Sequence, residues 1–158
     1  MITDVTLTAP SYVLLQSTAK CWKCLSNTPV TAVWVPSFVD LEEPDGFDEF
    51  AGEGGAGVLR YIQGLGDQTM AQLMEVAPWL KLGHSNSLGE VYLANHCIAC
   101  NALQGDHFLH GVDGPFFPQT REEARMLVLT EGSGPLRANA GAGQSGWMDW
   151  ITGRDIPH

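Results

Sequence analysis

Two Cys-x-x-Cys pairs, Cys21 with Cys24 and Cys97 with Cys100, constrain this chain more than any other feature. Two residues between the cysteines let one tight turn present two thiolates to the same ion. Two such turns supply the four ligands of a tetrahedral site, for which Zn²⁺ is the usual occupant. We therefore predict that the four cysteines hold one structural Zn²⁺.

The segments around the pairs have the patterns of strands. Residues 30–35 alternate and are rich in β-branched side chains. Residues 12–16, 90–94 and 106–110 are read as the other three strands. Strand, knuckle and strand, twice over, is the architecture of a zinc ribbon. Residues 25–96 separate the pairs, and this does not argue against a shared metal, because loop-closure entropy grows only logarithmically with length.

Other uses of the cysteines stay open. Disulfides would suit a secreted protein, but the N-terminus lacks the basic and apolar regions of a signal peptide. A redox pair needs a thiolate at a helix N-terminus, and neither pair precedes a convincing helix. His107 and His110 could join the second pair in a Cys₂His₂ set, which would leave the first pair without a metal.

The expected site is closed to substrate. Four thiolates fill a tetrahedral shell, whereas a catalytic zinc keeps one position for water. Knuckles of this kind also need a left-handed residue after the second cysteine. Asn101 tolerates that conformation, and Leu25 fits it poorly. The site is therefore predicted to be scaffold, so that function lies elsewhere in the chain.

We expect a single β-rich α+β domain over residues 1–158. Its zinc-ribbon-like core of antiparallel strands comprises residues 11–38 and 89–118, and residues 39–88 form a long insertion. The insertion is expected to carry an acidic surface loop, a short strand and one amphipathic helix, for which Asp67 is the predicted N-cap. The predicted apolar face of that helix consists of Met70, Leu73, Met74 and Ala77.

Residues 119–158 are expected to form a helical turn, a loop and a tryptophan-containing tail. Thr120-x-x-Glu123 is a capping-box pattern that begins a helix. Residues 126–131 fit either helix or strand, and the Gly/Ala/Ser-rich residues 132–146 read as loop. Trp147 and Trp150 indicate that the tail packs back onto the body.

The formal net charge of −10 is the second strong signal. It argues against nucleic-acid binding through phosphates, which requires clustered Lys and Arg. Asp45, Asp48 and Glu49 lie in a stretch with no basic residue. We therefore expect a non-enzymatic binding protein, such as an inhibitor, an immunity-type factor or an adaptor, that docks on a basic protein surface.

Two alternative functions are retained. One is an enzyme with its site around Asp106, His107 and His110, and the other is a thiol or metal redox sensor. The glycine-rich residues 52–57 lack the Lys-Ser/Thr of a phosphate-binding loop. No apolar stretch approaches the ~20 residues of a membrane span, and we expect a cytoplasmic protein without a membrane partner.

Parts of the chain resemble a group of uncharacterised bacterial proteins with split zinc-ribbon knuckles. The resemblance covers roughly residues 11–38 and 89–118. It implies paired cysteine knuckles and no particular reaction. The segments that carry it are Tyr12–Leu15, Cys21–Cys24, Thr28–Val30, Tyr92–Cys100 and Gln104–His110.

Overall fold

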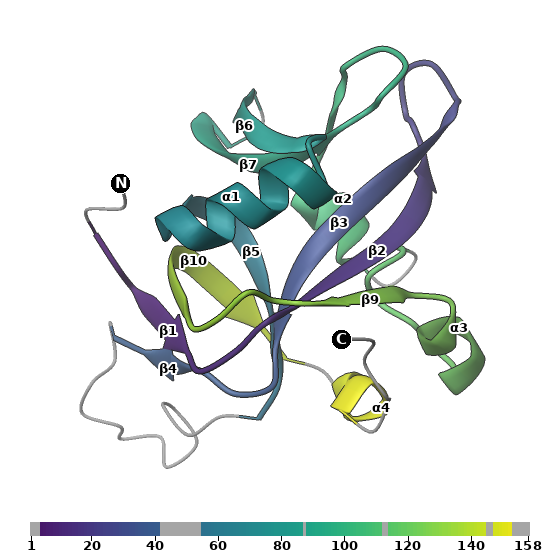
Figure 1. The fold of residues 1–158 in the computed structure, drawn as a ribbon. Helices are drawn as coiled ribbons and strands as arrows, with labels where there is room; N and C mark the ends of the chain where they lie inside the picture. Colours follow the sequence, from purple (N-terminus) through teal and green to yellow (C-terminus); the bar gives the residue numbers. More distant parts are fainter. Residues whose placement is uncertain (1–3, 42–54, 87, 112–113, 145–146, 153–158) are drawn as a thin grey trace.

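The structure is a computed structural model that describes residues 4–41, 55–86, 88–111, 114–144 and 147–152. The chain is rich in β-structure (Figure 1). The strands are β1 (Leu7–Ala9), β2 (Val13–Lys20), β3 (Asn27–Val35), β4 (Val39–Asp40), β5 (Gly57–Leu65), β6 (Leu80–Ser85), β7 (Glu90–His96), β8 (Leu103–Gln104), β9 (Val128–Glu131) and β10 (Leu136–Gly143). The helices are α1 (Asp67–Val76), α2 (Asp106–Leu109), α3 (Arg121–Arg125) and α4 (Met148–Thr152).

Within the described residues, ten strands form one antiparallel sheet. The main path runs β4-β1-β10-β5-β3-β2-β9, and β7 joins it through β5 while also pairing with β6 and β8. This confirms the expectation of a β-rich fold of antiparallel strands with few helices.

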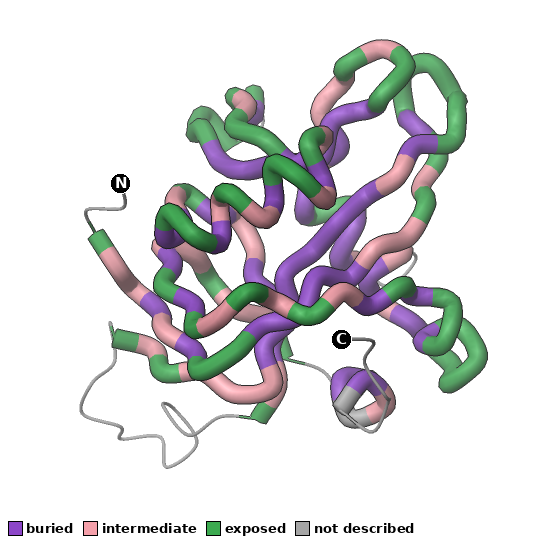
Figure 2. The backbone as a smooth tube through the Cα atoms, in the orientation of Figure 1, coloured by how far each residue is buried: buried purple, intermediate pink, exposed green. Residues whose placement is uncertain are grey.

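The sheet lies between two apolar clusters, because successive side chains on a strand point to opposite faces. On one face, Leu14 and Val33 pack with Leu73 of α1. On the other face, Leu15 packs with Trp34 and with residues of α2, α3 and α4. Figure 2 shows the buried residues concentrated along the central strands.

The predicted insertion is more than a loop with a helix. Residues 39–88 do carry α1, but they also supply β5, which pairs with β3, β10 and β7. The helix begins at Asp67 and its N-cap is Gly66, so the prediction of Asp67 as N-cap is wrong. Leu73 is buried as predicted, whereas Met74 is exposed.

Two segments differ from their predicted structure. Residues 106–110 were expected to be a strand, but they contain the short helix α2, and the strand that returns to β7 is β8. Asp106 begins that helix, where an acidic side chain is favoured. Residues 132–146 were expected to be a loop but contain β10, which pairs with both β1 and β5. Its small residues fit the interior of the sheet, and Ala138 is fully buried.

The other C-terminal predictions agree with the structure. The backbone N–H of Glu123 donates to Thr120 Oγ1 at 3.1 Å, as the capping box predicts. The undecided residues 126–131 form a strand from Val128 onward. Trp147 is buried and Trp150 packs beside it in the same cluster.

Candidate metal centre

Two β-hairpins carry the cysteine pairs at their tips. β2 and β3 pair from Val13↔Trp34 to Lys20↔Asn27, and the first pair lies in the turn between them. β7 and β8 flank the second pair in the same way. The two tips lie close together in space, and both are lined by exposed residues (Figures 1 and 2).

The two turns have the same hydrogen bonds. The N–H of Cys21 donates to Ser26 O at 2.9 Å, and the N–H of Leu25 donates to Cys21 O at 3.0 Å. In the second turn, Cys97 and Asn101 donate in the corresponding way at 2.9 and 2.8 Å. Each turn therefore closes around its first cysteine and directs both thiols to one side.

The residue after each second cysteine is left-handed. Leu25 and Asn101 both have φ of 66°. This confirms the predicted requirement at both positions, although only Asn is suited to that conformation. The first turn therefore holds a strained leucine whose side chain is mostly exposed.

Leu25→Asn is expected to raise the free energy of unfolding by about 0.5–1 kcal/mol, because Asn relieves the left-handed strain and the exposed leucine contributes little packing. Urea unfolding of the metal-loaded protein measures the change. Leu25→Ala is the matched control, since it also removes the leucine side chain but lacks the polar group with which Asn stabilises the left-handed conformation. Equal stabilities of the Asn and Ala variants would contradict this account.

Hydrogen bonds hold the two hairpins against each other. The Asn95 side chain accepts from the Thr31 N–H at 2.8 Å and donates to Thr31 O at 3.0 Å, so it pairs with β3 as a strand backbone would. Nearer the tips, Trp22 Nε1 donates to Leu103 O at 2.7 Å. The N–H of Ile98 donates to Thr28 Oγ1 at 3.2 Å.

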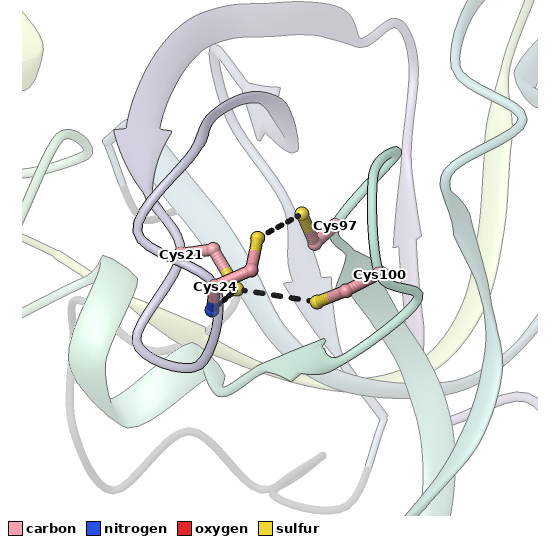
Figure 3. A group of neighbouring side chains, drawn as sticks. All are labelled: Cys21, Cys24, Cys97 and Cys100. Atoms are coloured by element: carbon pink, nitrogen blue, oxygen red, sulfur yellow. Dashed lines mark hydrogen bonds between the residues drawn. The ribbon is translucent and has the colours of Figure 1, made fainter.

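The four sulfur atoms converge on one point between the tips (Figure 3). All of them lie within 4.8 Å of one another. The Sγ atoms of Cys21 and Cys100 are 3.6 Å apart, and so are those of Cys24 and Cys97. A tetrahedron with metal–sulfur bonds of about 2.3 Å has edges of about 3.8 Å. The spacing therefore fits four ligands of one ion and is far too long for disulfides, whose sulfur atoms lie about 2.05 Å apart.

Hydrogen-bond donors surround the sulfur of Cys21. Burial raises the pKa of this thiol, but donors from the backbone of Cys24 and Lys23 and from the Gln104 side chain outweigh burial and lower it to about 6. Gln104 Nε2 lies 3.3 Å from the Cys21 sulfur. The turn and β8 thus favour the thiolate that a metal ion requires.

The neighbouring sulfurs affect the other thiols. Hydrogen bonds from Ser26 lower the pKa of Cys24. For Cys100, the backbone of Ala102 lowers the pKa, but burial and the three adjacent cysteines raise it to about 11. Four thiolates at these separations would repel one another. A cation at the centre would remove that repulsion.

The centre is partly shielded from solvent. Cys21 and Cys97 are buried, Cys100 is half-buried and Cys24 is exposed. A single metal at this point would meet sulfur on four sides, which leaves no position for a substrate. The four cysteines are therefore positioned to hold a metal ion as a cross-link between the hairpins.

The histidines lie apart from this group. His107 is exposed on α2, and His110 is buried against Phe116 with ring centroids 5.4 Å apart. His96, beside Cys97, directs Nδ1 to Ala94 O at 2.8 Å. Among the described residues, the ligand atoms that gather are the four sulfurs, so the Cys₂His₂ set is not formed.

Asp106 is also engaged elsewhere. Its carboxylate accepts from the Tyr61 N–H at 2.8 Å, and its own N–H donates to the hydroxyl of Tyr92 at 3.2 Å. Burial raises the pKa of Asp106 to about 6, although the Tyr61 hydrogen bond and the Arg60 charge oppose this. Asp106 and His107 line the same cavity, whereas His110 is buried against Phe116, so the structure does not bring the predicted trio together in one site.

This burial predicts a pH-dependent effect of Asp106→Asn. The folded carboxyl keeps its proton up to about pH 6, whereas its ordinary pKa is 3.8. Between these values the folded state binds more protons, so stability falls as pH rises. Asparagine keeps the acceptor without the charge, so the variant is expected to be about 2–3 kcal/mol more stable than the natural chain at about pH 8. The gain should shrink toward zero at about pH 4.

Denaturant unfolding of both proteins across this pH range measures the difference. Asp4→Asn is the control, since it makes the same chemical change at an exposed position. A stability difference for Asp106→Asn that stays constant between acid and alkaline pH would contradict burial of the charge as its cause.

Sequence reasoning missed three residues that position the centre: Trp22, Asn95 and Gln104. Asn95 follows three buried positions on β7 and lies two residues before Cys97. An amide in such an apolar strand was a usable signal, because a buried amide needs a partner.

The predicted partner-binding residues Asp45, Asp48 and Glu49 lie outside the described residues. Among the described helices, none is long and apolar enough to cross a membrane.

A scan against protein-family models, a search of curated proteins and a search of solved structures each found no match for this chain.

Proposed function

We propose that this chain is a non-enzymatic binding protein whose two hairpins are held together by a structural Zn²⁺, in the manner of a zinc ribbon. The observation that carries the proposal is the group of four sulfur atoms within 4.8 Å of one another. Its ligands come from two turns with the same hydrogen bonds, so the centre is built from two matching halves.

The donor set favours zinc. Four thiolates in a tetrahedral arrangement suit Zn²⁺ or an iron centre, and they do not suit the hard ions Mg²⁺ and Ca²⁺. Zinc carries no redox chemistry of its own and is the common ion of Cys₄ structural sites. A filled shell has no place for a reacting group, which supports a role in stability.

The charge of the chain supports a basic partner. The chain has eight Lys and Arg residues against 18 Asp and Glu. Three of the acidic residues lie close together in the sequence, namely Asp45, Asp48 and Glu49. Complementary charge speeds encounter with a basic surface and selects against acidic partners. The protein would thus act by binding and covering a basic protein surface, as an inhibitor, immunity-type factor or adaptor does.

Elemental analysis of the purified protein tests the metal. We expect one zinc per chain in the natural protein and none in Cys21→Ser. Iron in its place, which thiolate coordination would colour, would overturn the assignment to zinc. A chain that is folded and metal-free when purified without chelators would overturn the metal centre itself.

Partner capture tests the binding role. We expect the chain to retain a basic protein at about 0.1 M salt and to release it toward about 1 M, because the Debye length falls from about 10 to 3 Å. Neutralising Asp45, Asp48 and Glu49 together should weaken retention. The control neutralises Asp4, Glu75 and Glu122, which changes the net charge equally. Equal retention by the two triple variants would remove the acidic segment from the interface.

A further inference from the structure

The strand β2 has an edge that β9 covers only in part. β9 pairs with β2 from Val13↔Glu131 to Gln16↔Val128. β2 continues to Lys20 and keeps its pairing with β3 on the other side. In the part of the chain that the structure describes, no strand follows β9 along this edge.

The register shows which backbone groups this edge exposes. The N–H of Cys21 bonds to Ser26 on the β3 side. In an antiparallel pair, alternate residues face the partner strand. The N–H and C=O of Thr18 and Lys20 therefore point away from β3. Pro29, which has no N–H, lies opposite Thr18 and agrees with this alternation.

A groove of about 600 Å³ runs along the same edge. Residues 17–20 form one wall. The other walls are largely apolar and come from β8, α2 and the segment that leads into β9. The principal apolar residues are Trp22, Phe108, Pro115, Phe117, Pro118 and Met126.

Part of the apolar lining is open to solvent. Trp22 is 63% exposed, Phe108 is 75% exposed and Met126 is 77% exposed. Trp22 lies between the first two cysteines, and its Nε1 is held by Leu103 O. The candidate metal centre therefore fixes one end of the groove. Exposed large apolar side chains grouped beside unpaired backbone groups indicate a binding surface.

We propose that an extended segment of a partner protein binds in this groove as an added strand on β2. The segment has apolar side chains at alternate positions, which enter the groove, and its backbone pairs with Thr18 and Lys20. This inference rests on the proposed binding function and assigns it a surface. A strand is the ligand that matches backbone donors and acceptors repeated at every second residue.

Charge specifies the segment further. Among the residues that line the groove, the charged ones are Lys20 and Glu123. Lys20 lies toward the cysteine tip, and Glu123 lies in α3 (Figure 1). The bound segment therefore carries an acidic side chain near Lys20 and a basic one near Glu123. Lys20 also disfavours edge pairing between two copies of this chain, because like charges would approach each other.

A phage-displayed library of random linear peptides supplies the probe. Selection on the natural chain, with counter-selection on Thr18→Pro, is expected to enrich peptides with alternating apolar residues. Proline removes the edge N–H without breaking a bond to β3, since edge positions accept proline. The selected peptides should bind Thr18→Pro about tenfold or more weakly, while Thr18→Ala, which keeps the N–H, should bind them normally.

A second measurement covers the outcome in which Thr18→Pro does not fold, as metal content and thermal unfolding would show. N-methylation of a selected peptide at successive residues should abolish binding to the natural chain at every second position only. Peptides that tolerate methylation at every residue would overturn the added strand. Failure to enrich any peptide over the counter-selected pool would overturn the groove as a peptide site.

Two further outcomes distinguish the groove proposal from the proposed binding function and from self-association. If the acidic triple variant loses the captured partner but Thr18→Pro retains it, the binding function stands and the groove assignment fails. If sedimentation shows a dimer that Thr18→Pro dissociates, the edge binds a second copy and the proposed partner segment is wrong. We expect a monomer and a peptide affinity that the acidic triple variant leaves unchanged.

Discussion

A strong chelator is expected to lower the free energy of unfolding of this protein by about 5 kcal/mol or more. The reason is that the four sulfurs, within 4.8 Å of one another, come from the tips of two separate hairpins, which one ion would join. Structural zinc contributes about 10–16 kcal/mol in small zinc-finger peptides. Here the effect is smaller, because Asn95 and the two apolar clusters also hold the strands.

Cys97→Ser should reproduce the effect of the chelator and make further chelator ineffective. Ile98→Ser is the matched control, because Ile98 is exposed and lies between the same two cysteines. Urea unfolding measures the global change, and amide hydrogen exchange of residues 20–28 and 96–104 measures the local one. We expect protection to fall first at these tips. Unchanged unfolding of Cys97→Ser would show that the group is not a stabilising metal site.

Asn95→Ala is expected to destabilise the fold by about 3 kcal/mol, which is the second large effect. The change leaves the N–H and C=O of Thr31 without their partners, and both residues are almost fully buried. A buried backbone group that loses its hydrogen bond costs about 1–3 kcal/mol. Because the lost contact joins β3 to β7, the two cysteine tips should also separate and metal affinity should fall.

Asn139→Ala is the control for this prediction, since Asn139 is only half-buried on β10. We expect that variant to lie within about 0.5 kcal/mol of the natural chain. Competition with a coloured zinc indicator measures the metal affinity of both proteins. If Asn95→Ala unfolds normally and keeps its metal affinity, the side-chain bridge to Thr31 has no role in placing the tips.

The local patterns that the sequence revealed correctly are those set by neighbouring residues. The knuckles, the strand after Pro29, the helix α1 and the Thr120 capping box all depend on residues within one or two turns of chain. Their physical determinants are side-chain periodicity and short-range hydrogen bonds. Such features were accessible without any knowledge of distant contacts.

The predictions that were wrong concern segments whose structure is set by contacts with residues far away in the sequence. Residues 136–143 are rich in Gly and Ala, which are depleted in strands, yet they form β10 because β1 and β5 pair with them on both sides. Residues 106–109 form a helix because Asp106 is held by Tyr61 and Tyr92. In both places long-range pairing overrides local preference.

The sequence by itself determined that four thiols stand in two matching turns, because that spacing is a local property of each turn. Only the tertiary structure decided that the two turns meet. Their meeting depends on the antiparallel register of β2 with β3 and of β7 with β8, and on the buried Asn95 that joins β3 to β7. The open edge at Thr18 and Lys20 was likewise beyond local reading. An edge is defined by where the neighbouring strand stops, and the pairing of β9 with β2 ends at Gln16.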